Sequence, residues 1–176
     1  MTFPNRRYSI IYADPPWSYR DKKTNGYGGA ENHYRTMPIA QIKDLPVADI
    51  AEENCILFLW ATFPNLQEAL DVIISWGFKY KTLGFSWLKT YKTGKPFFGI
   101  GHYTRSNNEV CLIATKGRPS ISSHCVSSVI ISPIERHSKK PDICREKIVE
   151  LCGDVARIEL FAREWTPGWD CWGNEV

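Results

Sequence analysis

Long apolar segments are missing from this sequence. No run approaches the roughly 20 apolar residues that a membrane-spanning helix needs. The first seven residues are not followed by the apolar core of a secretion signal. These absences exclude a protein anchored by apolar membrane helices, and they lead us to expect a protein of the cytoplasm.

Metal-binding cysteine patterns are missing too. None of the six cysteines forms a Cys-x-x-Cys pair, and none lies at zinc-ligand spacing from a histidine. A thiol within an apolar segment of a cytoplasmic protein behaves as a small apolar side chain. We therefore expect reduced, packed cysteines, with no disulfide and no bound metal.

Repeats and low-complexity linkers are also missing from the 176 residues, which indicates one domain spanning 1–176. Apolar residues make up 43% and charged residues 23%, so the chain is neither a disordered tail nor a coiled coil. The net charge of +3 permits a nucleic-acid partner without requiring one. The aromatic content of 13% supplies rings that either fill a core or stack on bases.

What is present is an alternation of apolar runs and helical patterns. Expected strands cover 8–13, 55–60, 78–87, 110–115, 126–131 and 155–161. One expected helix follows Pro64 and stops near Gly77, and another follows Pro141 and stops at Gly153. The alternation predicts an α/β fold with a mostly parallel central sheet flanked by helices. Ligands of such sheets bind at the carboxyl ends of the strands.

Asp14, Pro15, Pro16 and Trp17 directly follow the first expected strand. Proline contributes no N–H, so the carbonyl groups of Asp14 and Pro15 are available as acceptors beside the Asp14 carboxylate. These acceptors and the flat face of Trp17 suit a planar ring that carries an amine. The alternative is a rigid turn with Trp17 in the core.

This Asp-Pro-Pro-Trp sequence after a strand resembles the catalytic motif of methyltransferases that act on adenine N6. With that motif first and the cofactor motif last, residues 8–175 resemble the MT-A70 family, including its small bacterial and phage members. The resemblance implies a Rossmann-like methyltransferase fold with a permuted motif order, S-adenosylmethionine as cofactor and no metal. It assigns catalysis to Asp14, Pro15, Pro16 and Trp17.

Glu159 lies within the last expected strand, in the run Ile-Glu-Leu-Phe-Ala-Arg. A buried carboxylate needs a partner, which is either Arg163 or Arg157 or a ligand with hydroxyl groups. The resemblance favours the ligand, because this run matches the cofactor motif of the family. It implies that Glu159 accepts hydrogen bonds from the ribose, with Phe161 and Arg163 beside it.

Lys140 lies directly before Pro141, at the N-terminal end of the second expected helix. A lysine at a helix N-terminus is a ready anion site, although an exposed basic turn is equally common. The resemblance implies that Lys140 holds the cofactor's carboxylate while Asp14 approaches its ammonium group. It also places Asn174 and Glu175 at the cofactor's adenosine. The alternative for this last stretch is an aromatic hairpin that closes the core.

Two long expected loops, 18–36 and 89–107, carry basic and aromatic side chains. The second has no acidic residue, so it suits phosphate groups. Trp17 and Tyr34 are expected to stack on the target base. The other expected substrate contacts are Lys89, Lys92, Lys95, Arg105 and Asn108, and a strand cap explains Asn108 equally well.

The sequence therefore predicts methyl transfer from S-adenosylmethionine to adenine N6 in DNA. RNA is the alternative substrate, and a silent nucleic-acid-binding subunit is the alternative class. A methyltransferase for a small amine would leave the basic loop unexplained. A homodimer or a partner subunit is one way to enlarge the nucleic-acid surface of a chain this size.

Overall fold

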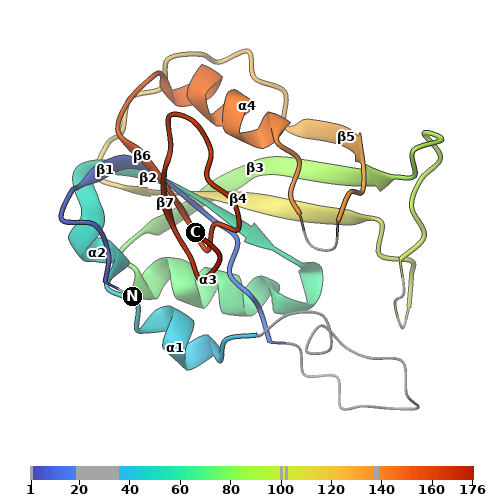
Figure 1. Ribbon diagram of the computed structural model, residues 1–176, viewed down its shortest axis with the longest axis horizontal. Helices are drawn as coiled ribbons and strands as arrows, with labels where there is room; N and C mark the ends of the chain where they lie inside the picture. The colour runs from blue at the N-terminus through green and yellow to red at the C-terminus, as the bar shows by residue number, and fades with distance from the viewer. Residues whose placement is uncertain (1, 19–35, 100, 102, 137–138) are drawn as a thin grey trace.

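The computed structural model describes residues 2–18, 36–99, 101, 103–136 and 139–176. Its core is one seven-stranded sheet with the strand order β5-β3-β4-β2-β1-β6-β7 (Figure 1). The strands are β1 (Tyr8–Ala13), β2 (Ala51–Ala61), β3 (Lys79–Thr90), β4 (Asn108–Lys116), β5 (Val129–Pro133), β6 (Arg157–Leu160) and β7 (Asp170–Trp172). The helices are α1 (Ile39–Lys43), α2 (Val47–Ile50), the 3₁₀ turn η2 (Phe63–Asn65), α3 (Leu66–Ser75) and α4 (Ile143–Cys152).

The sheet is mostly parallel, as the sequence predicts. Every pairing between described strands is parallel except the two that β4 makes with β2 and β3. β7 runs parallel to β6, which is not the pairing of the aromatic C-terminal hairpin that stood as the alternative for this stretch. The mixed α/β architecture is consistent with a methyltransferase fold.

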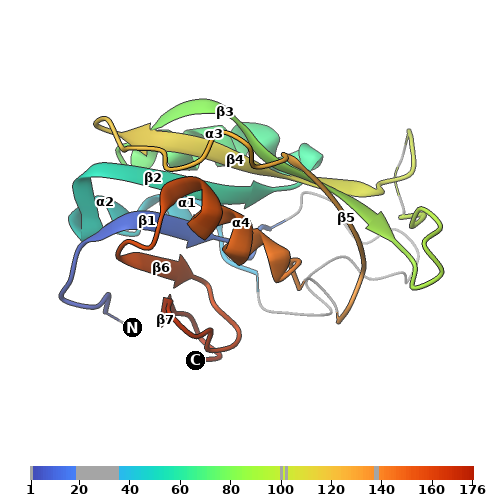
Figure 2. The same ribbon diagram turned by 90° about the horizontal axis from the view of Figure 1, so that it is seen from above.

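Helices cover both faces of the sheet (Figures 1 and 2). Side chains of α1, α2 and α3 pack with one set of strand residues, and α4 packs with the other set. β2 is covered on both faces, because its residues from Cys55 to Ala61 are all buried although successive side chains point to opposite faces. α3 and α4 end where the sequence predicts, since Gly77 and Gly153 take positive φ values of 80° and 86°. The short helices α1 and α2 were not predicted.

The carboxyl edge of the sheet gathers the chain's polar motifs. Ala13 at the end of β1 pairs with Leu59 on one side and with Leu160 on the other. β4 runs the opposite way, so its first residues lie at the same edge, and Glu109 pairs with Trp87 of β3. No helix in the described part of the chain is both long enough and apolar enough to span a membrane.

Candidate active site

Asp14 follows β1 at the carboxyl edge and is the first residue of the candidate site. Its side chain is 22% exposed, and its Oδ2 accepts a hydrogen bond from Lys140 Nζ at 2.7 Å. Burial raises the pKa of Asp14 above its ordinary value, while the charge of Lys140 opposes this shift. Asp14 is therefore a better proton acceptor than an exposed aspartate, and it is still held beside a cation.

Lys140 is buried, so it is not the exposed basic turn that was the alternative. Its side chain is 10% exposed, and Nζ lies 3.3 Å from Glu109 Oε2 as well as beside Asp14. Nζ also sits over the ring of Trp60, 5.6 Å from its centroid. Burial alone would lower the pKa of Lys140, but attraction to the two carboxylates raises it above its ordinary value. Lys140 therefore stays charged throughout the neutral range.

Glu109 connects Lys140 to Lys89, and sequence reasoning missed it. The Glu109 carboxylate forms an ion pair with each of the two lysines. Burial alone would raise its pKa, but Lys140 and Lys89 together lower it. The result is an alternating chain of charges, Lys89–Glu109–Lys140–Asp14, which we call the ion chain. The available signal was the polar run 104–109 that enters β4, from which Arg105 and Asn108 were selected as substrate contacts.

Lys89 belongs to the ion chain and not to the loop with which the sequence grouped it. It lies in β3, its side chain is 17% exposed, and its charge is paired with Glu109. Phosphate binding therefore stays a prediction for the exposed Lys92, Lys95 and Arg105, which we call the loop cations. Asn108 is half-buried at the start of β4, and Tyr34 lies outside the described residues.

The two prolines and Trp17 form a tight, internally bonded turn. The Trp17 amide donates to the Pro15 carbonyl at 2.8 Å, and the Met37 amide donates to the Pro16 carbonyl at 2.9 Å. The Pro15 oxygen is therefore already an acceptor, although a carbonyl has a second lone pair. Trp17 is 3% exposed, and its indole N–H donates to the Trp60 carbonyl at 3.0 Å. The structure gives Trp17 a packing role, and base stacking by this ring stays a prediction.

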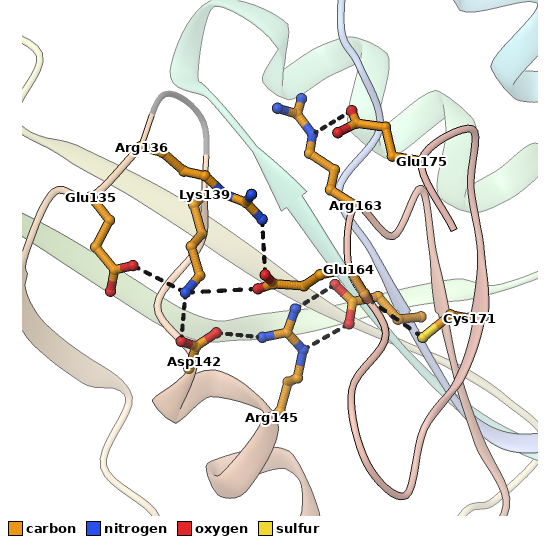
Figure 3. A network of polar contacts seen from close by, with 10 residues as sticks. Glu135, Arg136, Lys139, Asp142, Arg145, Arg163, Glu164, Cys171 and Glu175 are labelled. Carbon is orange, nitrogen blue, oxygen red and sulfur yellow. Dashed lines mark hydrogen bonds and ion pairs between the residues drawn. The ribbon is translucent and has the colours of Figure 1, made fainter.

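Glu159 lies in β6, between Tyr12 of β1 and Cys171 of β7 in the register of the sheet. The sequence offered Arg163 or Arg157 as one alternative for its partner, but Arg145 of α4 holds it instead, with two hydrogen bonds. Arg145 Nε lies 2.7 Å from Oε2, and Nη2 lies 2.8 Å from Oε1 (Figure 3). Burial raises the pKa of Glu159, and the guanidinium opposes this shift. Sequence reasoning missed Arg145, which lies two residues beyond the start of α4.

The segment after β6 bends sharply beside the site. Phe161 takes a φ of 63°, and its ring meets the Trp172 ring edge-on at 5.6 Å between centroids. A bulky residue in this region of φ is strained, which is a feature of functional sites. Arg163 Nε lies 3.7 Å from Glu175 Oε1, so two of the predicted cofactor residues approach each other. Asn174 and Glu175 are exposed.

Within residues 2–18, 36–99, 101, 103–136 and 139–176, no three His, Cys, Asp or Glu side chains gather as metal ligands. The site therefore consists of a paired carboxylate at Asp14, a buried cation at Lys140 and a second carboxylate at Glu159, all near one edge of the sheet.

Known methyltransferases are similar to this chain over nearly its whole length. M.MunI, a Type II methyltransferase of Mycoplasma sp, is 33% identical over 191 aligned positions, which cover 98% of this chain and 79% of the relative. The N6-methyladenosine RNA methyltransferase MTA1 of Pyricularia oryzae is 31% identical, with 96% of this chain and 47% of the relative covered. The human N(6)-adenine-specific methyltransferase METTL4 is 27% identical, with 97% and 38% covered. The model of the MT-A70 family matches residues 8–175, and the chain belongs to that family.

Proposed function

We propose that this chain transfers a methyl group from S-adenosylmethionine to adenine N6 in DNA. The observation that carries the proposal is the contact between Asp14, which ends β1, and Lys140, which precedes α4, although 126 positions separate them. Residues 1–176 form one methyltransferase domain in this proposal. Its motif order is permuted, with the catalytic Asp14 early in the chain and the cofactor residue Glu159 late.

The donor and acceptor groups of the site fit S-adenosylmethionine. The amino-acid end of that molecule carries one carboxylate and one ammonium group, which match the cation of Lys140 and the carboxylate of Asp14. Its ribose carries two hydroxyl donors, which match the buried carboxylate of Glu159. Two oxygens provide about four acceptor positions, and Arg145 uses one on each oxygen. Phe161, Arg163, Asn174 and Glu175 complete the proposed cofactor site.

The chain's own contribution to the reaction is to orient the target amine and accept its proton. When bound, S-adenosylmethionine would supply an electrophilic methyl group, to which the N6 lone pair would bond as the carbon–sulfur bond breaks to leave a neutral thioether. The adenine amine donates hydrogen bonds to Asp14 and to the second lone pair of the Pro15 carbonyl. These acceptors stabilise the positive charge that develops on N6. The proton lost by N6 passes to Asp14, whose pKa burial raises.

Nucleic-acid binding is assigned to the segment between β3 and β4. The loop cations are all exposed, and Phe98 and Tyr103 beside them are 64% and 101% exposed. Basic groups that track phosphates and aromatic rings that stack on bases form a typical single-strand surface. A target adenine reaches Asp14 only from a single strand or after it is flipped from a duplex.

We prefer DNA to RNA as the substrate because this chain covers a larger share of the Type II methyltransferase than of the RNA methyltransferase. The chain covers 79% of M.MunI, a Type II methyltransferase, and only 47% of the fungal RNA methyltransferase. RNA is the second candidate because the fungal relative is 31% identical to this chain. The assembled Asp14–Lys140 pair argues against a silent subunit, and the loop cations argue against a small amine as substrate.

The proposal is tested with methyl-labelled S-adenosylmethionine and three polymers: single-stranded DNA, duplex DNA and RNA. Each polymer is digested and the labelled nucleoside identified, with Asp14→Ala as the inactive control. N6-methyladenine in DNA is the expected product. Label in RNA alone would replace DNA by RNA, and label in no polymer despite cofactor binding would overturn the proposed activity of the chain on its own.

A further inference from the structure

Arg145 is a largely buried cation outside the ion chain, and it holds two carboxylates. All three guanidinium nitrogens are engaged, because Nη1 lies 2.8 Å from Asp142 Oδ1 while Nε and Nη2 hold the two oxygens of Glu159. The side chain is only 12% exposed, and that of Glu159 only 9%. A planar fork facing a carboxylate fixes the plane of the carboxylate as well as its position.

Glu159 depends on this one cation for its charge. Burial favours its neutral form, and the nearby carboxylates of Asp14 and Glu164 favour the neutral form further. Arg145 is the group that opposes them. The two titratable neighbours in the register, Tyr12 and Cys171, have pKa values raised by burial and are neutral at physiological pH.

Arg145 also connects Glu159 to the other half of the site. Asp142 accepts hydrogen bonds from both Arg145 and Lys139, and Lys139 in turn contacts Glu135 and Glu164 (Figure 3). Lys139 adjoins Lys140, whose Nζ contacts Asp14. One network of charges therefore runs from the proposed ribose acceptor to the residue next to the proposed carboxylate ligand.

We propose that Arg145 is a positioning residue for cofactor selection, which aims the Glu159 carboxylate at ribose hydroxyl groups and thereby makes the site selective for a ribonucleoside cofactor. The inference rests on the proposed function, because it takes Glu159 as the ribose acceptor. Arg145 occupies one lone pair on each oxygen, and the remaining lone pairs are held in one orientation. Without the fork, the carboxylate rotates or takes up a proton, and a neutral carboxyl is a weaker acceptor.

The experiment measures binding of S-adenosylhomocysteine and of its 2′-deoxy and 3′-deoxy counterparts by calorimetry, using the full chain. Losing one hydrogen bond to a charged acceptor weakens binding by about 10- to 100-fold, so the wild type should prefer the ribose compound by that factor. Arg145→Gln should weaken binding of the ribose compound by about 10-fold or more and shrink the preference to less than about 3-fold. Arg145→Lys keeps the charge without the fork, so it should restore affinity only in part.

Arg136→Gln is the matched control. Arg136 contacts Glu164 in the same network at 2.9 Å, but it does not contact Glu159 and its side chain is 56% exposed. This variant should keep both the affinity and the preference. If Arg145→Gln fails to fold, which a melting curve reports, Arg145→Lys carries the test alone.

The outcomes separate the inference from the proposed function. One outcome is that the Arg145 variants lose the same affinity for the ribose and the deoxy compounds, and another is that they lose none. Either result would show that Arg145 only joins α4 to the sheet. A wild type that binds all three compounds equally would remove Glu159 from the ribose and overturn the inference, while the labelled-product assay would still decide the proposed methyl transfer. If the wild type prefers the ribose compound and the Arg145 variants keep the same affinity and preference, the inference alone would be overturned.

Discussion

Replacing Lys140 by methionine tests the ion chain directly. The change keeps most of the side-chain volume but removes the cation shared by Asp14 and Glu109. All three side chains are largely buried, with exposures of 10%, 22% and 16%. Removing one partner of a buried ion pair costs about 3–5 kcal/mol, because the remaining charges lose their compensation. For a chain of this size that loss lowers the melting temperature by about 6–20 °C.

The pH dependence of this loss follows from the direction of each shift. The pKa of Glu109 is lowered in the fold, so its stabilising contribution is present above its unfolded pKa and disappears as pH falls. The pKa of Lys140 is raised, so its contribution is complete at neutral pH and disappears only when pH rises through the folded value. In the variant Asp14 loses its cation and Glu109 keeps only Lys89, so the pKa values of both carboxyl groups rise. The destabilisation should therefore be larger near about pH 8 than near about pH 5, where the carboxyl groups are partly neutral.

Lys139→Met is the matched control for this prediction. Its partners Glu135 and Asp142 are more than half exposed, so the same loss of charge should cost less than about 1 kcal/mol. Both variants are unfolded with urea at the two pH values, without cofactor. Equal destabilisation of the two variants, or a Lys140→Met effect that does not change with pH, would refute the description of the ion chain as a buried, mutually compensated unit.

Three further predictions concern chemistry, substrate and backbone. Asp14→Asn should lower kcat by at least about 100-fold while cofactor affinity falls much less, and equal losses in both would deny Asp14 its role at the amine. Replacing the three loop cations by glutamine should reduce the slope of log affinity against log salt by about 2 to 3 for DNA, and an unchanged slope would place the phosphates elsewhere. Gly173→Ala would bring a Cβ within 2.1 Å of the Ala162 oxygen, so we expect about 1–3 kcal/mol of destabilisation in a urea titration, and a normal midpoint would contradict this packing.

Most of the fold could be predicted from local patterns. The long apolar run that became β2 and the glycines that end α3 and α4 are strong signals, because burial on both faces and positive φ each restrict the residue type. α1 and α2 were missed, since five and four residues are too short to show a helical period. β7 was not predicted as a strand, and its parallel pairing with β6 differs from the hairpin that stood as the alternative, because three residues do not reveal strand direction.

The candidate site was predicted only where it matches a motif. Asp14, Lys140 and Glu159 stand in recognisable sequences, and the structure brings Asp14 and Lys140 into contact. Glu109 and Arg145 carry no such signal, because each acts through a partner distant in sequence: Glu109 is 31 positions from Lys140, and Arg145 is 14 positions from Glu159. Only the antiparallel course of β4 places Glu109 at the carboxyl edge.

The balance of charges in the ion chain explains why a site for a charged reaction can be buried here. Lys89 and Lys140 contribute two positive charges, and Glu109 and Asp14 two negative ones, so the chain is neutral as a whole. Burying a neutral row of alternating charges costs far less free energy than burying any one of those charges alone. In the proposed reaction Asp14 would turn from Lys140 towards an amine, and Glu109 would still compensate the charge of Lys140. On that proposal Glu109 would let Asp14 change partners at a lower free-energy cost than a lone Lys140–Asp14 pair would allow.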